Sequence, residues 1–167
     1  MRTILIPTDF DAHAVAGTGV ILGNFNDKKI RILFFHAYKL TDSISELLSL
    51  RRRTAEYGHI PNAFHDACYQ FRADHADRIY TIGIEYFYGS TMAAFRNFLE
   101  ANEVEAIFYP EDYTFRKISK YSIDPALFLK KSGLPLLEPV AQIINTPIKE
   151  GVLNEETILE ESDLIDS

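Results

Sequence analysis

Hydrophobic residues in this chain gather in short continuous runs, and the stretches between the runs repeat apolar residues at helical spacing. Runs that are apolar throughout, rather than alternating with polar residues, are typical of strands whose two faces are both covered. They predict five strands, at residues 3–9, 31–38, 79–84, 106–109 and 134–140. Apolar residues three or four positions apart predict helices between them, at about 12–20, 44–48, 64–71, 90–102 and 124–133.

The alternation of these strands and helices predicts an α/β fold with a doubly wound parallel sheet and helices on both faces. The length of 167 residues suits one domain. Composition changes after Val140, so we expect a single domain over residues 1–140 and an acidic C-terminal tail over residues 141–167. Pro135 and Pro139 would each remove a donor from the last strand, which places that strand at a sheet edge or in an interface.

The acidic charge is concentrated in the last eighteen residues, which contain no Lys or Arg. Their seven carboxylates are Glu150, Glu155, Glu156, Glu160, Glu161, Asp163 and Asp166. Since the whole chain has 24 acidic and 17 basic residues, the 17 acidic residues that remain balance the basic ones. A neutral body with an acidic tail has no field that attracts phosphate backbones, so nucleic acid is not an expected partner.

The N-terminal run is too short for a signal-peptide core and contains Pro7, and no stretch approaches the roughly 20 apolar residues of a membrane span. The single cysteine, Cys68, excludes an internal disulfide framework and lies in an apolar helical stripe, as a small core residue would. We therefore expect a cytoplasmic protein without a membrane partner.

Several of these segments resemble those of universal stress proteins. The run from Ile4 to Phe10 resembles their opening strand and turn, and it is the specific part of the resemblance. The run ending in His36-Ala37-Tyr38 resembles their second strand, Glu105 to Pro110 their fourth, and Asp124 to Val140 their closing helix and strand. Over residues 1–140 the resemblance implies a five-stranded parallel sheet of order 3-2-1-4-5, and a homodimer paired through the last strand.

One branch of that family binds ATP through a signature after strand four, which reads G-x-x-G, nine residues, then G-S or G-T. The matching positions here are Pro110, Tyr113 and, allowing one deletion, Ser122-Ile123. Glycines let the backbone approach phosphates, whereas proline has no N–H to donate and tyrosine adds bulk. We therefore expect no ATP bound through this loop and no cofactor.

A nucleotide bound in another manner stays open as the alternative. The positions that in the family surround adenine and ribose are here Pro7, Thr8, Asp9 and Ala37. The altered loop also carries Arg116, Lys117 and Lys120. Their charges could hold the phosphates of ATP or AMP, or they could be solvated or pair with the acidic tail.

Signals of catalysis or metal binding are missing from the sequence. It has no G-x-S-x-G elbow, no lysine-terminated phosphate loop and no histidines at metal-ligand spacing. His36 is interpreted as a packed strand residue, and either Asp9 or Asp11 as the cap of the first helix. Ligands of such sheets bind where the strand order reverses, in a crevice that Asp9, Tyr38 and residues 110–112 would border.

Aromatic residues are dense near the predicted strand ends: Tyr38, Tyr86, Phe87, Tyr88, Tyr109, Tyr113, Phe115 and Tyr121. They either fill the space that the family leaves for ATP or line a small-molecule pocket or a dimer contact. From the sequence we expect a stress-related regulatory or interaction module, homodimeric and open to a protein partner, rather than an enzyme. The alternative is an adenine-nucleotide sensor with altered phosphate contacts.

Overall fold

The computed structural model describes residues 2–25, 29–39, 58, 60–110 and 113–137. The helix predicted at 44–48, the end of the last strand and the tail from 141 to 167 lie outside the described residues.

The five strands form one parallel sheet. They are β1 (Arg2–Pro7), β2 (Ile30–Tyr38), β3 (Ile79–Tyr88), β4 (Val104–Phe108) and β5 (Leu136–Leu137). Their order is β3-β2-β1-β4-β5 and every pair is parallel, which confirms the predicted doubly wound topology. Ile4 on the central strand is in register with Ile32 of β2 on one side and Ala106 of β4 on the other.

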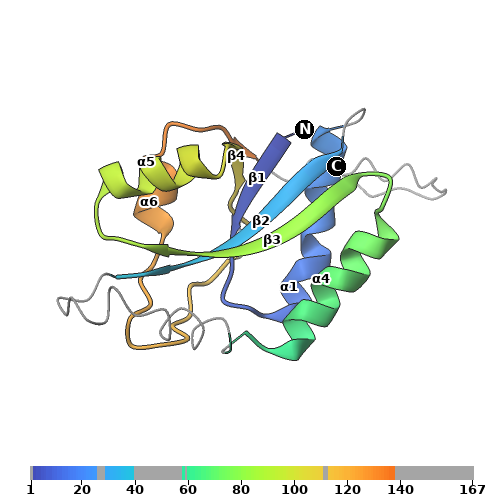
Figure 1. Ribbon diagram of the computed structural model, residues 1–167, viewed down its shortest axis with the longest axis horizontal. Helices are drawn as coiled ribbons and strands as arrows, with labels where there is room; N and C mark the ends of the chain where they lie inside the picture. Colours follow the sequence, from blue (N-terminus) through green and yellow to red (C-terminus); the bar gives the residue numbers. More distant parts are fainter. Residues whose placement is uncertain (1, 26–28, 40–57, 59, 111–112, 138–167) are drawn as a thin grey trace, which may run out of the picture.

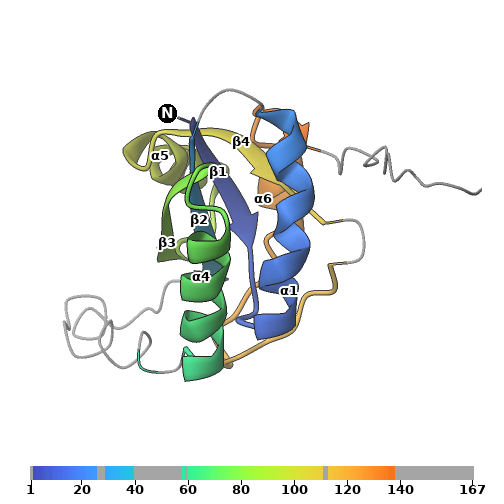
Figure 2. The same ribbon diagram turned by 90° about the vertical axis from the view of Figure 1, so that its right-hand side faces the viewer.

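Helices cover both faces of the sheet. They are α1 (Ala12–Gly17) with the 3-10 helix η1 (Thr18–Asn24), α4 (Asn62–Asp74), α5 (Met92–Ala101) and α6 (Ala126–Lys130). Figure 1 shows α1 and α4 on one face and α5 and α6 on the other, and the turned view in Figure 2 shows α1 and α4 side by side in front of the strands. Among the described helices, none has the length and apolar character that a bilayer crossing requires.

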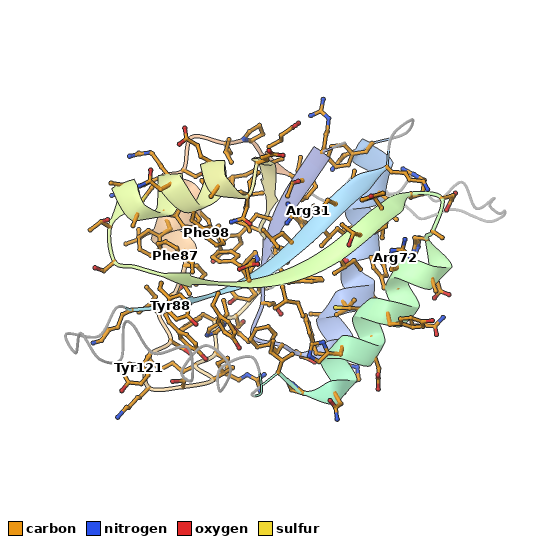
Figure 3. All side chains as sticks on the ribbon, in the orientation of Figure 1. Arg31, Arg72, Phe87, Tyr88, Phe98 and Tyr121 are labelled. Atoms are coloured by element: carbon orange, nitrogen blue, oxygen red, sulfur yellow. The ribbon has the colours of Figure 1, made fainter. Side chains whose placement is uncertain are left out.

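Side-chain alternation along the strands creates two cores. Ile4 and Ile6 of β1 enter the core under α1 and α4, and Leu5 between them enters the core under α5 and α6. All three are buried, which explains why the strand is apolar at three successive positions rather than at alternate ones. The second core is rich in phenylalanine rings, and Figure 3 shows Phe87 and Phe98 converging between β3 and α5, with ring centroids 5.3 Å apart.

Several element ends differ from their predicted positions, and three of these differences have a clear local cause. The strand expected at 79–84 continues to Tyr88, because β2 supplies partners as far as Tyr38. The first helix turns into a 3-10 helix after Gly17, where glycine weakens α-helical structure. The last helix has Pro125 at its N-cap, although the Asp124 carboxylate does accept a hydrogen bond from the N–H of Ala126 at 3.0 Å.

Candidate functional site

A cleft of about 1180 Å³ opens at the carboxyl end of the sheet, on the side of α1. Strands β1 and β4 are neighbours here, and the connections that follow them leave toward opposite edges, which is where ligands of such sheets bind. The floor of the cleft is apolar and includes Ile6, Phe34 and Phe108. One wall is α1, where Ala14 and Gly17 leave room. The other wall is the segment after β4, which lines the cleft with Pro110 and residues 113–116.

Six of the ten site residues expected from the sequence line this cleft: Pro7, Thr8, Asp9, Pro110, Tyr113 and Arg116. Ala37 and Ser122 are instead buried, at 1% and 3% exposure. Lys117 and Lys120 are exposed on the same segment, and the Lys120 ammonium lies 5.1 Å from the ring centroid of Tyr121. The structure thus brings the six lining residues together around the cleft and leaves Ala37, Ser122 and the two lysines outside its lining.

Asp9 joins the end of β1 to the segment after β4. Its Oδ1 accepts a hydrogen bond from the Tyr113 hydroxyl at 2.9 Å, and its Oδ2 accepts one from the main-chain N–H of Arg116 at 2.7 Å. The Arg116 guanidinium donates to the carbonyl of Asp9 at 3.3 Å. Helix capping, the other role considered for this residue, belongs to Asp11, whose Oδ1 accepts from the N–H of His13 at 3.0 Å.

A strained turn sets the direction of the Asp9 side chain. The next residue, Phe10, has φ of 65°, a conformation that costs a side-chain-bearing residue about 1–2 kcal/mol. The Thr8 hydroxyl stabilises the turn by accepting from the N–H of Phe10 at 2.9 Å. Phe10 is buried against Phe64 and Tyr86, so packing in the core offsets the backbone strain.

The pKa values of this group reflect burial first and pairing second. Burial raises the pKa of Asp9, while the hydrogen bonds from Tyr113 and Arg116 and the Arg116 charge oppose that rise, as does His36 when it is protonated. Burial and the adjacent Asp9 carboxylate raise the pKa of Tyr113, which keeps its hydroxyl protonated as a donor. Burial lowers the pKa of His36, although its bond to Thr8 and the Asp9 charge act in the other direction.

His36 also connects the end of β1 to the segment after β4. Its Nδ1 lies 2.8 Å from the carbonyl oxygen of Thr8 and its Nε2 lies 2.7 Å from Oγ of Ser122. The ring is 2% exposed, so the interpretation as a packed strand residue is right about burial. That interpretation misses the polar role, because the partner Ser122 is 86 positions away in the sequence.

Asp9, His36 and Ser122 are the residue types of a hydrolytic triad, but the serine is not placed to attack a substrate. Ser122 Oγ already accepts hydrogen bonds from the N–H groups of Ile118 at 3.1 Å and Ser119 at 3.2 Å. These bonds occupy both of its lone pairs, and the residue is buried. The arrangement therefore positions the segment around Ser122.

Residues 121–123 add a short antiparallel pairing to the carboxyl end of β2. The N–H of Ile123 donates to the Ala37 carbonyl at 2.9 Å, and the N–H of Lys39 donates to the Tyr121 carbonyl at 2.9 Å. Figure 3 shows Tyr88 at the end of β3 and Tyr121 at this end of the sheet. The main-chain groups at this end of β2 are thus bonded to the chain itself.

The aromatic rings expected near the strand ends lie close to these bonds. The Tyr38 and Tyr86 rings stack with centroids 5.0 Å apart, and Phe115 stacks over His36 at 6.3 Å. Phe115 also lines the cleft. The rings therefore fill the space beside β2, and the open volume lies toward α1.

Two features of the site were missed in the sequence. Ala14 and Gly17 form the open wall of the cleft, and their three-residue spacing on one helix face was the signal that could have found them. The carbonyl of Thr8, which orients His36, leaves no trace in sequence because every residue has a carbonyl.

Neither a family model nor a curated protein matches this sequence. Its fold does match solved structures. Universal stress protein UspA from Lactobacillus plantarum superposes with a TM-score of 0.50 at 14% identity, over 81% of this chain and 95% of that one. A universal stress protein in complex with cAMP gives a TM-score of 0.42 at 18% identity, over 81% of this chain and 94% of that one.

A universal stress protein family protein from Arabidopsis thaliana with AMP bound gives a TM-score of 0.43 at 12% identity, over 82% of this chain and 90% of that one. At such identities the likeness concerns the fold alone. The match to the Lactobacillus protein and the order of the five strands agree, and the chain therefore has a universal-stress-protein-like α/β fold.

Proposed function

We propose that this chain is a regulatory or interaction module of the universal stress protein type, and that it does not hold ATP through main-chain contacts of the segment after β4. The observation that carries the proposal is the hydrogen bonding of that segment. Main-chain N–H groups that already have acceptors within the chain are those of Tyr113, Arg116, Ile118, Ser119, Tyr121, Ser122 and Ile123.

A loop that wraps a triphosphate needs successive main-chain N–H groups directed at the phosphates. Here the main-chain N–H of Arg116 already donates to a carboxylate, so it is not free to donate to a phosphate. Binding ATP in that manner would have to break several of these bonds at once. The loss would offset the gain from the phosphate contacts.

On the side of such a site that would hold adenine, a main-chain carbonyl is also hydrogen-bonded within the chain. The Ala37 carbonyl, at a position that the resemblance assigns to the surroundings of adenine, accepts from Ile123. A base bonded there would displace residues 121–123 from β2. The cleft toward α1 has an apolar floor, and we propose it as the place where an effector of this module binds.

The last strand supports a homodimer as the form of this module. β5 pairs with β4 on one side and is the outermost strand of the described sheet. Leu136 of β5 and Leu127 of α6 are large apolar side chains exposed at 44% and 67%. A second copy paired along β5 would cover them, and edge strands are prone to this pairing.

Native mass spectrometry of the purified protein tests the proposal. The expected result is a dimer without adenine nucleotide, which Leu136→Lys converts to a monomer because a charge is placed on the pairing edge. Tyr69→Lys is the matched control, since Tyr69 is an exposed aromatic residue on α4, and it should leave the dimer intact. An adenine nucleotide that copurifies in stoichiometric amount would overturn the proposal.

The alternative is an adenine-nucleotide sensor that holds phosphates through side chains. It is favoured by the three cations Arg116, Lys117 and Lys120 on the segment beside the cleft, all of them exposed. In that case Arg116→Ala and Lys117→Ala should each weaken AMP or ATP binding measured by calorimetry. Unchanged affinity in both variants would exclude the side-chain contacts.

A further inference from the structure

His36 is the one side chain in the described residues that bonds both the end of β1 and Ser122. Its Nδ1 faces the Thr8 carbonyl and its Nε2 faces Oγ of Ser122. Because the chain around Ser122 is paired with β2 through Ile123 and Tyr121, this histidine supports the attachment of residues 118–123 to the sheet.

The positions of the hydrogens follow from counting donors and acceptors. A carbonyl oxygen only accepts, so Nδ1 of His36 carries a hydrogen that it donates to Thr8. Ser122 Oγ uses both lone pairs for the N–H groups of Ile118 and Ser119. Its own hydrogen must therefore go to Nε2, which requires a lone pair there. Every group in the network has a partner only when the ring is neutral.

A proton on Nε2 would break this network. Three N–H donors would then converge on one oxygen that has two lone pairs, and the hydroxyl hydrogen of Ser122 would lose its acceptor. His36 and Ser122 are both buried, so water does not replace the hydrogen-bond partners that these groups lose. At least one of the bonds that hold residues 118–123 must open.

The surroundings of the ring favour the neutral form. The aromatic neighbours are Phe10, Tyr38, Tyr86 and Phe115. Among the residues that the structure describes, the charged group facing the ring is Asp9, whose Oδ1 lies 3.7 Å from Nδ1, and Asp9 is itself bound by Tyr113 and Arg116. Helix α4 reaches the cluster through Phe64, which is apolar. Burial is the larger influence and lowers the pKa of His36.

We propose that His36 is a proton-sensitive latch: the neutral ring holds residues 118–123 on the carboxyl end of β2, and the protonated ring releases them. Release exposes the Ala37 carbonyl and the Lys39 N–H, which are an acceptor and a donor at the end of a strand. The latch responds to protons and needs no ligand, so it goes beyond the function proposed above and can fail or hold independently of it.

Amide hydrogen exchange measured by NMR on the full chain tests the latch. The quantity is the protection factor, which is the exchange rate of an unstructured peptide at the same pH divided by the rate measured in the protein. The reporters are the amides of Ile123 and Lys39, and the reference is the amide of Ile30, which donates to Arg78 at the other end of β2. On titration from about pH 7.5 to about pH 4, the reporters should lose protection about tenfold relative to Ile30, as expected for one lost hydrogen bond.

Two variants separate the latch from acid unfolding. His36→Gln cannot titrate and should show a constant ratio of reporter to reference protection at every pH. Ser122→Ala removes the bond to Nε2 and should show the lowered ratio already at neutral pH, without further change. His13→Gln, at an exposed histidine that borders the cleft, should keep the wild-type response. Reporters that follow Ile30 throughout, or a pH response that survives in His36→Gln, would overturn the proposal.

Discussion

The carboxylate of Asp9 accepts a hydrogen bond from the main-chain N–H of Arg116 at 2.7 Å, across 107 positions of the sequence. This bond fixes one wall of the cleft, because the segment that carries Arg116 lies opposite α1. It also places an anion of the protein itself at an amide that a phosphate would otherwise use. The structure of the site and its proposed lack of a triphosphate therefore depend on the same contact.

Replacing Asp9 by alanine should destabilise the fold more than replacing Asp11. Asp9→Ala leaves the Tyr113 hydroxyl and the Arg116 amide without their acceptor, which costs about 1–3 kcal/mol. Asp11→Ala removes a helix N-cap and should cost about 1 kcal/mol or less. Urea unfolding of both variants gives the comparison. A smaller loss for Asp9→Ala than for Asp11→Ala would show that the contact to the segment is unimportant for stability.

Removing the Tyr113 hydroxyl should raise the pKa of Asp9 further. The hydroxyl donates to the carboxylate and stabilises its charged form, so Tyr113→Phe leaves burial less opposed. The measurement is an NMR titration of the Asp9 carboxyl carbon. Tyr109→Phe is the control, because that ring lies 5.7 Å from Tyr113 and is not one of the groups that shift Asp9. An Asp9 pKa equal to that of the wild type would refute the role of the hydroxyl.

Stability should depend on pH through His36, with a sign set by its lowered pKa. The unfolded histidine takes up a proton near 6.5 while the folded one stays neutral. The free energy of unfolding should therefore be highest above that value and should decrease as pH falls below it, by up to about 1.4 kcal/mol per pH unit. The decrease ends once the folded pKa is passed.

The contribution of Asp9 to the free energy of unfolding changes with pH in the opposite direction. Its folded pKa is raised above 3.8, so the folded chain holds the proton to higher pH than the unfolded chain does. Its contribution to stability is complete below pH 3.8 and is lost as pH rises through the folded pKa.

Urea unfolding of the wild type and of His36→Gln at several pH values isolates the contribution of His36, as the difference between their free energies of unfolding. A difference that does not change with pH would contradict its assignment as a buried neutral group.

The thiol of Cys68 should be inert in the folded protein. The residue is 8% exposed on α4, and burial raises its pKa from 9.0 to about 12. That shift lowers the thiolate fraction at neutral pH by about a thousandfold. A colorimetric thiol reagent should therefore modify the protein slowly without denaturant and rapidly in concentrated urea. Fast stoichiometric modification of the native chain would show that the thiol is reactive.

The sheet was predictable because its strands are encoded locally. A strand such as β1, covered on both faces, needs apolar residues at successive positions, and Ile4, Leu5 and Ile6 show this directly. The end of β3 was not predictable in the same way. Glu85 and Tyr86 look like a strand end, yet pairing with Phe35 and His36 of β2 continues the strand past them.

The polar contacts of the site could be predicted only in part. A crevice at the strand ends with Asp9 beside it follows from topology, and a cleft with Asp9 in its lining lies there, whereas Tyr38, expected at its border, is buried and does not line it. Whether Asp9 or Asp11 caps the helix is undecided in sequence, since both stand at suitable positions. The choice is made by Tyr113 and Arg116, which stand 104 and 107 positions away in the sequence and contact Asp9 only in the folded chain.

The central claim is that seven main-chain amides between residues 113 and 123 are hydrogen-bonded within the chain and do not wrap a triphosphate. A ¹H–¹⁵N NMR titration with Mg·ATP tests it most directly, because each main-chain N–H reports separately. We predict that the amides of Arg116, Ile118, Ser119 and Ile123 keep their chemical shifts at saturating nucleotide. Saturable shifts of these four amides, as phosphates replace their present acceptors, would contradict the account.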